Sequence, residues 1–491
     1  MSKIKDCSNY GKLMLLVGVL VAAPLLCLPF YPEEHKYLPS FLLPAIFSAL
    51  IGSLLCVFGK HDASENSDRQ DAVGASSLTV LFVWLWGILC GSVPFLLSGQ
   101  LTLIQALFES VSGWTTTGLS VMDVAHTSHI FLLYRSLMQY CGGLGFVMMM
   151  VMLVSGKQSM NLFNAEGHPD KLMPNLKKTA QMIFAMYLSF LAVGTAAYVI
   201  AGMPLFDSVC HTMCALSTGG FSTRLDSIGT FHSLPIELIT IVLMLIGTTN
   251  FAVLLLLVKR KWRQVSRVSE IRFLFVLLLL FIPPTALSLA KGFGTNFDTG
   301  LRRASFDLVS ALSTTGYSTM SYADWPPFAL GVMILMMLIG GGMGSTAGGM
   351  KLTRVYLLLR MLGLNIKKRI LPQRTVNAPY YRKAQSKAKI DVALCEDTVG
   401  FTGCYLILFV LGSLLLTLTT GHGLMEAMFE FASALGTVGL SIGLTGPATG
   451  ASTLIIEIIG MILGRLEIFI VLIGFYSGFR AVKRSVKKAS C

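Results

Sequence analysis

The sequence Asp307-Leu-Val-Ser-Ala-Leu-Ser-Thr-Thr-Gly316 is the basis of the fold prediction, because the chain carries four versions of it. In each version an acidic residue or a histidine is followed by small and mainly apolar residues and then by Thr-x-Gly; Leu, Phe or Tyr and then Ser follow the glycine. About 12 residues of this composition form a helix about 18 Å long, which enters a bilayer without crossing it. The versions run from Glu109 to Gly118, from His211 to Gly220, from Asp307 to Gly316 and from Glu430 to Gly439.

The composition around these stretches is that of a membrane protein. Of the 491 residues 54% are hydrophobic and 13% are charged, about half of the roughly 25% charged residues of soluble proteins. Runs long enough to cross a bilayer predict ten spans, which would place both termini on the same side. The predicted spans are residues 12–30, 38–59, 77–98, 128–154, 179–202, 232–258, 271–290, 328–358, 397–420 and 452–479.

The basic residues predict the orientation of these spans. Of 38 Lys and Arg residues, 31 fall in the termini and loops on the side of the N-terminus. Because cytoplasmic loops carry the excess of Lys and Arg, we expect a multi-pass protein of the cell membrane with both termini cytoplasmic. The net charge of +13 is therefore a signal of topology and not of nucleic-acid binding. The basic residues on the other side are Lys36, Arg135, Arg224, Lys291, Arg302 and Arg303.

The four copies predict an all-α polytopic fold with an ion pathway. Each repeat would consist of a helix, a short pore helix, a Thr-x-Gly filter loop and a second helix, and four repeats related by pseudo-symmetry would surround one pore. Irregular backbone at membrane depth is tolerated where it lines a water-filled cavity. Rings of peptide oxygens there can replace the hydration shell of a cation. The expected boundaries are 1–70 for a two-helix extension, and 71–178, 179–270, 271–395 and 396–491 for the repeats.

Two alternatives concern this motif. The four Thr-x-Gly sequences could be helix-ending turns without a binding role. The residue nine positions before each glycine could stabilise the positive N-terminal end of the pore helix instead of meeting the ion, and we favour this second interpretation. The filter residues expected to bind the cation are Thr116, Thr117, Gly118, Thr218, Gly219, Gly220, Thr314, Thr315, Gly316, Thr437, Val438 and Gly439.

A glycine-rich segment interrupts the eighth predicted span and is a candidate gate. Each glycine costs about 1 kcal/mol in a helix interior relative to Ala, so we expect a break that faces a wet cavity just inside the filter. Close packing of helices through small residues is the alternative. The segment comprises Gly340, Gly341, Gly342, Met343, Gly344, Ser345, Thr346, Ala347, Gly348 and Gly349.

Arg465 is the second gate candidate, because it lies within the last predicted span. A charge in that position costs at least about 2.5 kcal/mol unless it faces water or a partner. Glu467 and Glu457 are two and eight residues away, spacings that do not bring side chains together on one helix. The sequence therefore favours a pore position for Arg465 over an internal ion pair.

The order of filters, glycine-rich segment and late arginine resembles the Trk/Ktr/HKT superfamily of potassium transporters, and within it the Trk-type membrane subunits. The resemblance covers essentially the whole chain. It implies potassium as the transported ion, since none of the four filter glycines is replaced by Ser, and a gate made by the glycine-rich loop and a pore arginine. A sodium-permeable or sodium-coupled transporter of the same fold is the alternative.

The resemblance also implies partners. Members of this superfamily form homodimers and bind a TrkA-like cytoplasmic ring of nucleotide-binding regulatory subunits. The basic segments 259–272 and 367–389 could dock such a ring, or could act only in orientation and in contacts with anionic lipid. The chain has no GxxxxGK[ST] motif, so we expect no nucleotide or other cofactor on it. We also expect no enzymatic activity, because the eight His form no H-E-x-x-H motif, and no disulfide among the ten scattered Cys.

Overall fold

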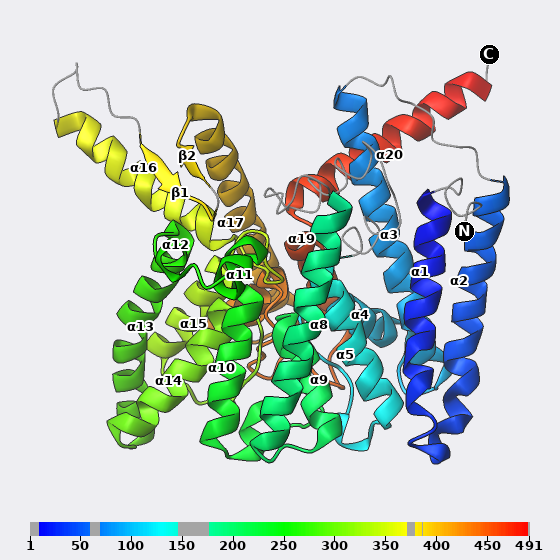
Figure 1. Cartoon of the computed structure of the whole chain (residues 1–491), viewed down its shortest axis with the longest axis horizontal. Helices are drawn as coiled ribbons and strands as arrows, with labels where there is room; N and C mark the ends of the chain where they lie inside the picture. The colour runs from blue at the N-terminus through cyan, green and yellow to red at the C-terminus, as the bar shows by residue number, and fades with distance from the viewer. Residues whose placement is uncertain (1–8, 59–68, 146–175, 371–378, 385, 490–491) are drawn as a thin grey trace.

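The computed structural model describes residues 9–58, 69–145, 176–370, 379–384 and 386–489. Within these ranges the regular secondary structure is helical apart from a small antiparallel pair of strands, β1 (Tyr380–Arg382) and β2 (Lys387–Lys389). Figure 1 shows the helices as a bundle, with both described ends on its upper side. Four short 3-10 helices lie in the connections: η1 (Ala23–Cys27), η2 (Pro32–Tyr37), η3 (Val124–His126) and η4 (Ser227–Phe231).

Four repeats of a long helix, a short helix and a second helix form the main body, as the sequence predicts. The C-terminal halves of the short helices are buried and consist mainly of small and apolar residues; Phe108, Phe306 and Phe429 are fully inaccessible. The repeats comprise α3 (Arg69–Leu97), α4 (Leu103–Trp114) and α5 (His129–Leu144); α8 (Leu176–Ile200), α9 (Leu205–Leu216) and α10 (Leu234–Thr248); α13 (Ser269–Phe293), α14 (Phe297–Leu312) and α15 (Pro327–Ile339); and α17 (Val392–Thr420), α18 (Leu424–Gly436) and α19 (Ala451–Arg465).

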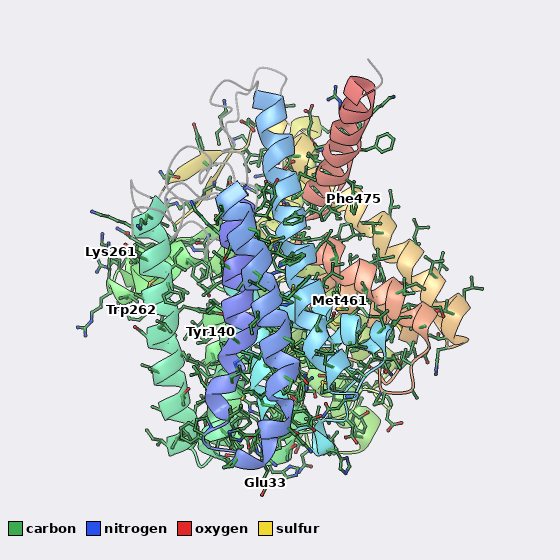
Figure 2. The ribbon with its side chains drawn as sticks, turned by 90° about the vertical axis from the view of Figure 1, so that its right-hand side faces the viewer. Glu33, Tyr140, Lys261, Trp262, Met461 and Phe475 are labelled. Carbon is green, nitrogen blue, oxygen red and sulfur yellow. The ribbon has the colours of Figure 1, made fainter. Side chains whose placement is uncertain are left out.

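The N-terminal hairpin of α1 (Asn9–Ala22) and α2 (Leu38–Phe58) packs beside the first repeat. Glycines let its two helices approach closely, since a Cβ on Gly11 would lie 2.7 Å from Gly52 O and one on Gly18 would lie 2.9 Å from Ala45 O. Small residues at such contacts are typical of helix pairs in membranes. Figure 2 shows the two helices side by side along the bundle.

Three of the predicted spans are interrupted, and only one of these breaks was expected. The eighth span is broken between α15 and α16 (Leu352–Ile370), as predicted. The span 232–258 was predicted to be continuous, but α10 and α11 (Phe251–Val258) meet at 118°. The backbone is extended at Thr249, and the Asn250 side chain caps α11 by accepting from Ala252 N–H at 2.7 Å. A polar cap inside an apolar run therefore ends one helix and starts another.

The last predicted span, 452–479, is also bent, because α19 and α20 (Ile468–Ala489) meet at 101°. Glu467 at this bend has a φ of 57°, in the left-handed region. The breaks turn α16 and α20 away from the bundle at its upper side (Figure 1). The small helix α12 (Trp262–Val265) lies near α16. Figure 2 shows α20, with Phe475, leaving the bundle at the end opposite Glu33.

Six described helices are long and apolar enough to cross a membrane, and eight if each bent pair is one span. Multiple spans are thus confirmed, whereas the predicted number of ten is not. Residues 146–154 of the fourth predicted span lie outside the described residues. None of the eight cysteines in the described ranges forms a disulfide.

Candidate ion-conducting site

Each short helix ends in the same turn, which sets the path of the filter loop. In the first repeat Thr116 N–H donates to Gly113 O at 3.2 Å and Thr117 N–H donates to Ser112 O at 2.9 Å. This pair of bonds ends a helix with a residue in the left-handed region, and Thr116 has a φ of 55°. The other three loops repeat both bonds, with φ values of 52° at Thr218, 55° at Thr314 and 50° at Thr437.

The four filter glycines form a closed ring of contacts between successive loops. Each has a positive φ, between 75° and 97°, which L side chains rarely adopt. Each also abuts the carbonyl oxygen of the middle filter residue in the next loop, so closely that no Cβ fits. A Cβ on Gly118 would lie 2.2 Å from Gly219 O, one on Gly220 1.9 Å from Thr315 O, one on Gly316 1.9 Å from Val438 O and one on Gly439 2.2 Å from Thr117 O. The contacts therefore run from repeat one to two, three, four and back to one.

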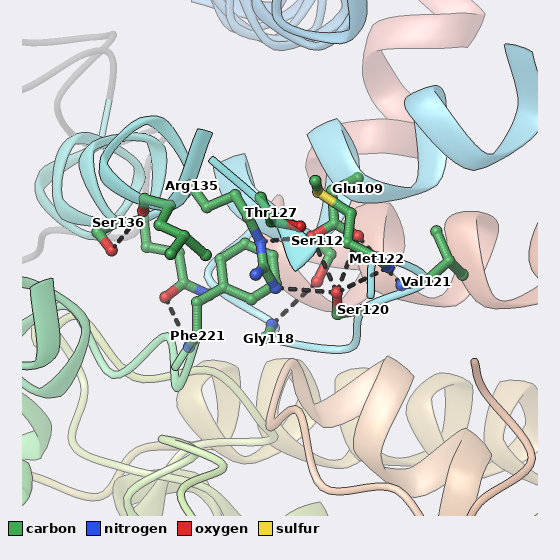
Figure 3. Close-up of polar contacts among 12 residues, drawn as sticks. Glu109, Ser112, Gly118, Ser120, Val121, Met122, Thr127, Arg135, Ser136 and Phe221 are labelled. Carbon is green, nitrogen blue, oxygen red and sulfur yellow. Dashed lines mark hydrogen bonds and ion pairs between the residues drawn. The ribbon is translucent and has the colours of Figure 1, made fainter. Parts of the chain in front are cut away.

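The residue nine positions before each glycine supports the segment that follows the filter. In the first repeat the buried Glu109 carboxylate accepts from Ser120 Oγ at 3.0 Å and Val121 N–H at 3.1 Å. It also forms an ion pair with the buried Arg135, with 2.6 Å between Nε and Oε1. Figure 3 shows this network, in which the Arg135 guanidinium stacks on Phe221 from the second loop.

The other repeats use the same position in the same way. His211 Nε2 lies 3.0 Å from Ser222 Oγ, and the Asp307 carboxylate accepts from the Thr319 hydroxyl at 3.0 Å. The preference for a role at the helix N-terminus is therefore wrong. The short helices begin at Leu103, Leu205, Phe297 and Leu424, which places these residues in the second turn or beyond, where they reach sideways to the returning chain.

The ring departs from fourfold symmetry in the second repeat. Gly219 O accepts from Gln139 Nε2 at 2.6 Å, and Phe221 N–H donates to Gln139 Oε1 at 3.0 Å. Gln139 on α5 thus clamps the second loop through two backbone groups. In the fourth loop Val438 brings no hydroxyl to the position that Thr117 and Thr315 occupy.

A cavity of about 400 Å³ lies on one side of the ring. The four filter glycines and the four serines two residues after them all line it, so the loops share one opening. These serines are Ser120, Ser222, Ser318 and Ser441.

The glycine-rich segment lies against the other side of the ring. Thr314 Oγ1 accepts from Gly348 N–H at 2.8 Å, and Thr346 Oγ1 lies 3.2 Å from Thr218 Oγ1. A Cβ on Gly348 would lie 2.1 Å from Thr437 Oγ1. The segment thus touches three of the four loops at their first threonine. Beyond it the adjoining cavity holds about 40 Å³, a tenth of the volume of the outer one.

Arg465 binds this segment to the first repeat. Its Nη1 donates to Thr346 O at 2.5 Å and its Nη2 donates to Gly142 O at 2.6 Å, at the end of α5. Glu467, the alternative partner, instead pairs with Arg354 at 3.0 Å. The structure therefore brings together the two gate candidates that the sequence singled out separately.

Asn250 and Glu270, which the sequence analysis did not single out, hold the same segment from the opposite side. Asn250 Nδ2 donates to Met343 O at 2.5 Å, and Glu270 Oε1 accepts from Met343 N–H at 2.7 Å and from the Thr353 hydroxyl at 2.9 Å. The feature of the sequence that could have identified Asn250 is its position as a polar residue within an apolar run. Glu270 follows a basic segment and carries no such signal.

A ring of four loops that share one opening, among helices long and apolar enough to cross a membrane, is the arrangement of a membrane transport protein. Within the described ranges no group of three or more His, Cys, Asp or Glu residues could hold a metal ion. The chain belongs to the TrkH family of cation transport proteins, whose family model matches residues 43–290 and 296–479.

Individual relatives agree over nearly the whole chain. The chain is 31% identical to the Trk system potassium uptake protein TrkH of Vibrio parahaemolyticus, over 94% of this chain and 96% of that protein. It is 28% identical to the Trk system potassium uptake protein TrkG of Escherichia coli, over 96% of each. The crystal structure of the potassium transporter TrkH from Vibrio parahaemolyticus superimposes with a TM-score of 0.81 at 28% identity, covering 96% of this chain and 98% of that one.

Proposed function

We propose that this chain carries potassium ions across the cell membrane through the ring of filter loops, one pore per chain. The observation that carries the proposal is the closed ring of glycine contacts, because it requires the four loops to surround one axis. The relatives that match over nearly the whole length include Trk system potassium uptake proteins, and all four filter positions hold Gly rather than Ser.

The geometry supports coordination of a dehydrated cation. In each loop the first and third filter residues have positive φ and the second does not, an alternation that allows successive carbonyls to face the same side. Peptide oxygens in such a ring replace water around the ion. The hydroxyls of Thr116 and Thr437 are buried and have no hydrogen-bond partner in the described structure, so they can add oxygens at the inner end. The short helices also direct their negative C-terminal ends to the ring.

The glycine-rich segment and Arg465 form the closed gate in this proposal. Their contacts occupy the inner face of the ring, and the positive guanidinium repels cations there. The large cavity then faces the outside, and the termini and the helices α16 and α20 face the cytoplasm, in agreement with the distribution of basic residues. We assign the four repeats to residues 71–178, 179–270, 271–395 and 396–491, which start two to four residues after the first residues of α3, α8, α13 and α17.

Control by a partner completes the proposal. The chain would form a homodimer and bind a cytoplasmic ring of nucleotide-binding subunits near the basic segments 259–272 and 367–389. The second segment includes the strands β1 and β2, and Arg382 N–H donates to Ser269 Oγ at 3.0 Å, next to Glu270, which holds the gate. A partner that moved the strands β1 and β2 would therefore act on Met343 through Glu270.

The reversal potential of liposomes that carry the purified protein tests the function. We expect the potential to follow an imposed potassium gradient and to respond little to an equal sodium gradient, because the ring spacing is set by backbone contacts. Empty liposomes are the control. A potential that follows sodium equally well would identify the sodium-permeable alternative, and no current with either ion would contradict an ion pathway.

A further inference from the structure

Two buried glutamates in the fourth repeat share a single threonine hydroxyl. Glu430 on α18 and Glu457 on α19 are both fully inaccessible. Thr445 Oγ1 is within hydrogen-bond distance of Glu430 Oε1 and lies 2.9 Å from Glu457 Oε1. No basic side chain forms an ion pair with either glutamate within the described ranges.

The hydrogen bonds at this site require one more proton than two ionised carboxylates and one hydroxyl provide. A threonine hydroxyl carries one proton, and an ionised carboxylate only accepts hydrogen bonds. If both glutamates were ionised, one of the two contacts to Thr445 would have no proton, and two like charges would be buried together. Carboxyl groups so close normally share a proton.

The surroundings assign that proton to Glu457. Glu430 accepts from the Ser441 hydroxyl at 2.7 Å, from Ile442 N–H at 3.0 Å and from Thr445 N–H at 3.1 Å, all of which stabilise its charged form. Glu457 Oε2 is buried and has no hydrogen-bond partner in the part of the chain that the structure describes. A neutral carboxyl tolerates such a position far better than a carboxylate.

The first repeat shows what replaces the proton elsewhere. Arg135 stands seven residues before Gly142, and Glu457 stands seven residues before Gly464. Each of these glycines packs closely on the last turn of the short helix of its own repeat. In the first repeat the buried acid is therefore neutralised by Arg135. The fourth repeat has a second acid at the equivalent position, so a proton must do what the arginine does.

We propose that Glu430 and Glu457 form a proton-binding site that opens to the outer solution through Thr445 and holds one proton per chain. The proton leaves Glu457 through the Thr445 hydroxyl, which is only half-buried in the loop 441–450, to an outside water or hydroxide. Once Glu457 has lost this proton, two carboxylates remain with only the Thr445 hydroxyl proton between them. Their repulsion then acts on the segment that continues directly from the fourth filter loop.

The charged groups around the site leave Glu430 as the one that acts on Glu457. The elements packed on α19 are α18, α17, α4 and α20. α18 presents Glu430, α17 contributes the neutral Thr419, which meets Thr453, and Glu109 on α4 is paired with Arg135. Arg465 lies eight residues along α19, about 12 Å away at 1.5 Å per residue, and its neighbour Glu467, before α20, is paired with Arg354.

Infrared difference spectroscopy of the purified full chain, recorded while the outer pH is raised, tests the site. We expect the wild type to lose the C=O stretching band of one protonated carboxyl and to release the corresponding proton. Glu457→Gln should lack both signals, because an amide fills the same space and cannot ionise. Glu33→Gln removes an exposed glutamate from the end of the molecule that we assign to the outside, and it should keep both signals.

Potassium uptake provides a second measurement, which separates this inference from the proposed function on which its transport role rests. Wild-type uptake should fall as the band is lost, whereas uptake by Glu457→Gln should not change with pH. A folded Glu457→Gln protein that keeps the wild-type band and proton release would overturn the site and leave potassium transport untouched. If neither protein carried potassium but the band behaved as expected, the proton site would stand and the proposed function would fall.

Discussion

Replacing Gly316 by Ala should lower rubidium uptake into liposomes by about two orders of magnitude, the scale on which a 1 Å misplacement of a binding group costs activity. A Cβ on Gly316 would lie 1.9 Å from Val438 O, whereas real Cβ contacts are not found below 3.0 Å. Both atoms belong to backbone that the third and fourth loops fix, and the φ of 83° at Gly316 already disfavours a side chain. The overlap can be relieved only if the loops move apart, which widens the ring around the ion.

Gly331→Ala is the matched control for this variant. Gly331 lies on α15 in the same repeat, and no atom outside its own helix surroundings approaches its Cβ position within 4 Å. Its uptake should equal that of the wild type. If Gly316→Ala transported as well as Gly331→Ala, the third and fourth loops would not be in contact at the ion pathway.

Replacing Arg465 by Ala should raise rubidium uptake in the absence of any partner by at least about tenfold. Arg465 donates to Thr346 O and Gly142 O, and hydrogen bonds from charged groups contribute about 1.5–3 kcal/mol each. Their loss weakens the closed position of the gate, and about 1.4 kcal/mol changes an equilibrium tenfold. The variant also removes the fixed positive charge from the path of the cation.

Deleting Ser345 to Gly348 should produce a larger leak, because this stretch makes the contacts with Thr218 and Thr314 that cover the ring. Arg480→Ala is the control for both variants, since it removes an exposed arginine from α20, outside the bundle. Wild-type uptake by both the deletion and Arg465→Ala would count against a gate at this position.

The sequence was sufficient for the repeats and the filter loops, because Thr-x-Gly recurs four times in a fixed relation to the spans. A left-handed threonine and a glycine with positive φ are local properties of each copy, whereas the exclusion of a Cβ at each glycine comes from the neighbouring loop. Their convergence followed from the number of copies together with the need to keep irregular backbone away from lipid. The break after Ile339 was equally visible, because six of the ten residues that follow are glycine.

Contacts between distant segments could not be predicted in the same way. The bend at Glu467 lies three residues after Gly464, a single glycine that does not by itself predict a break, and the structure shows the bend in the left-handed conformation of Glu467. Nothing in the sequence indicated that Gln139 would clamp the second loop, or that Arg354 would take Glu467 and leave Arg465 to bind carbonyls. The role expected of Glu109 at the N-terminal end of its helix was wrong, because α4 begins at Leu103, six residues before Glu109.

A density map of the protein prepared with rubidium in place of potassium tests whether the four filter loops bind one cation, because rubidium scatters anomalously. We expect an anomalous peak on the axis of the ring, within coordination distance of peptide oxygens from all four filter loops. A map with rubidium only at sites that touch one or two loops, or with any of Gly118, Gly220, Gly316 and Gly439 facing lipid, would contradict it.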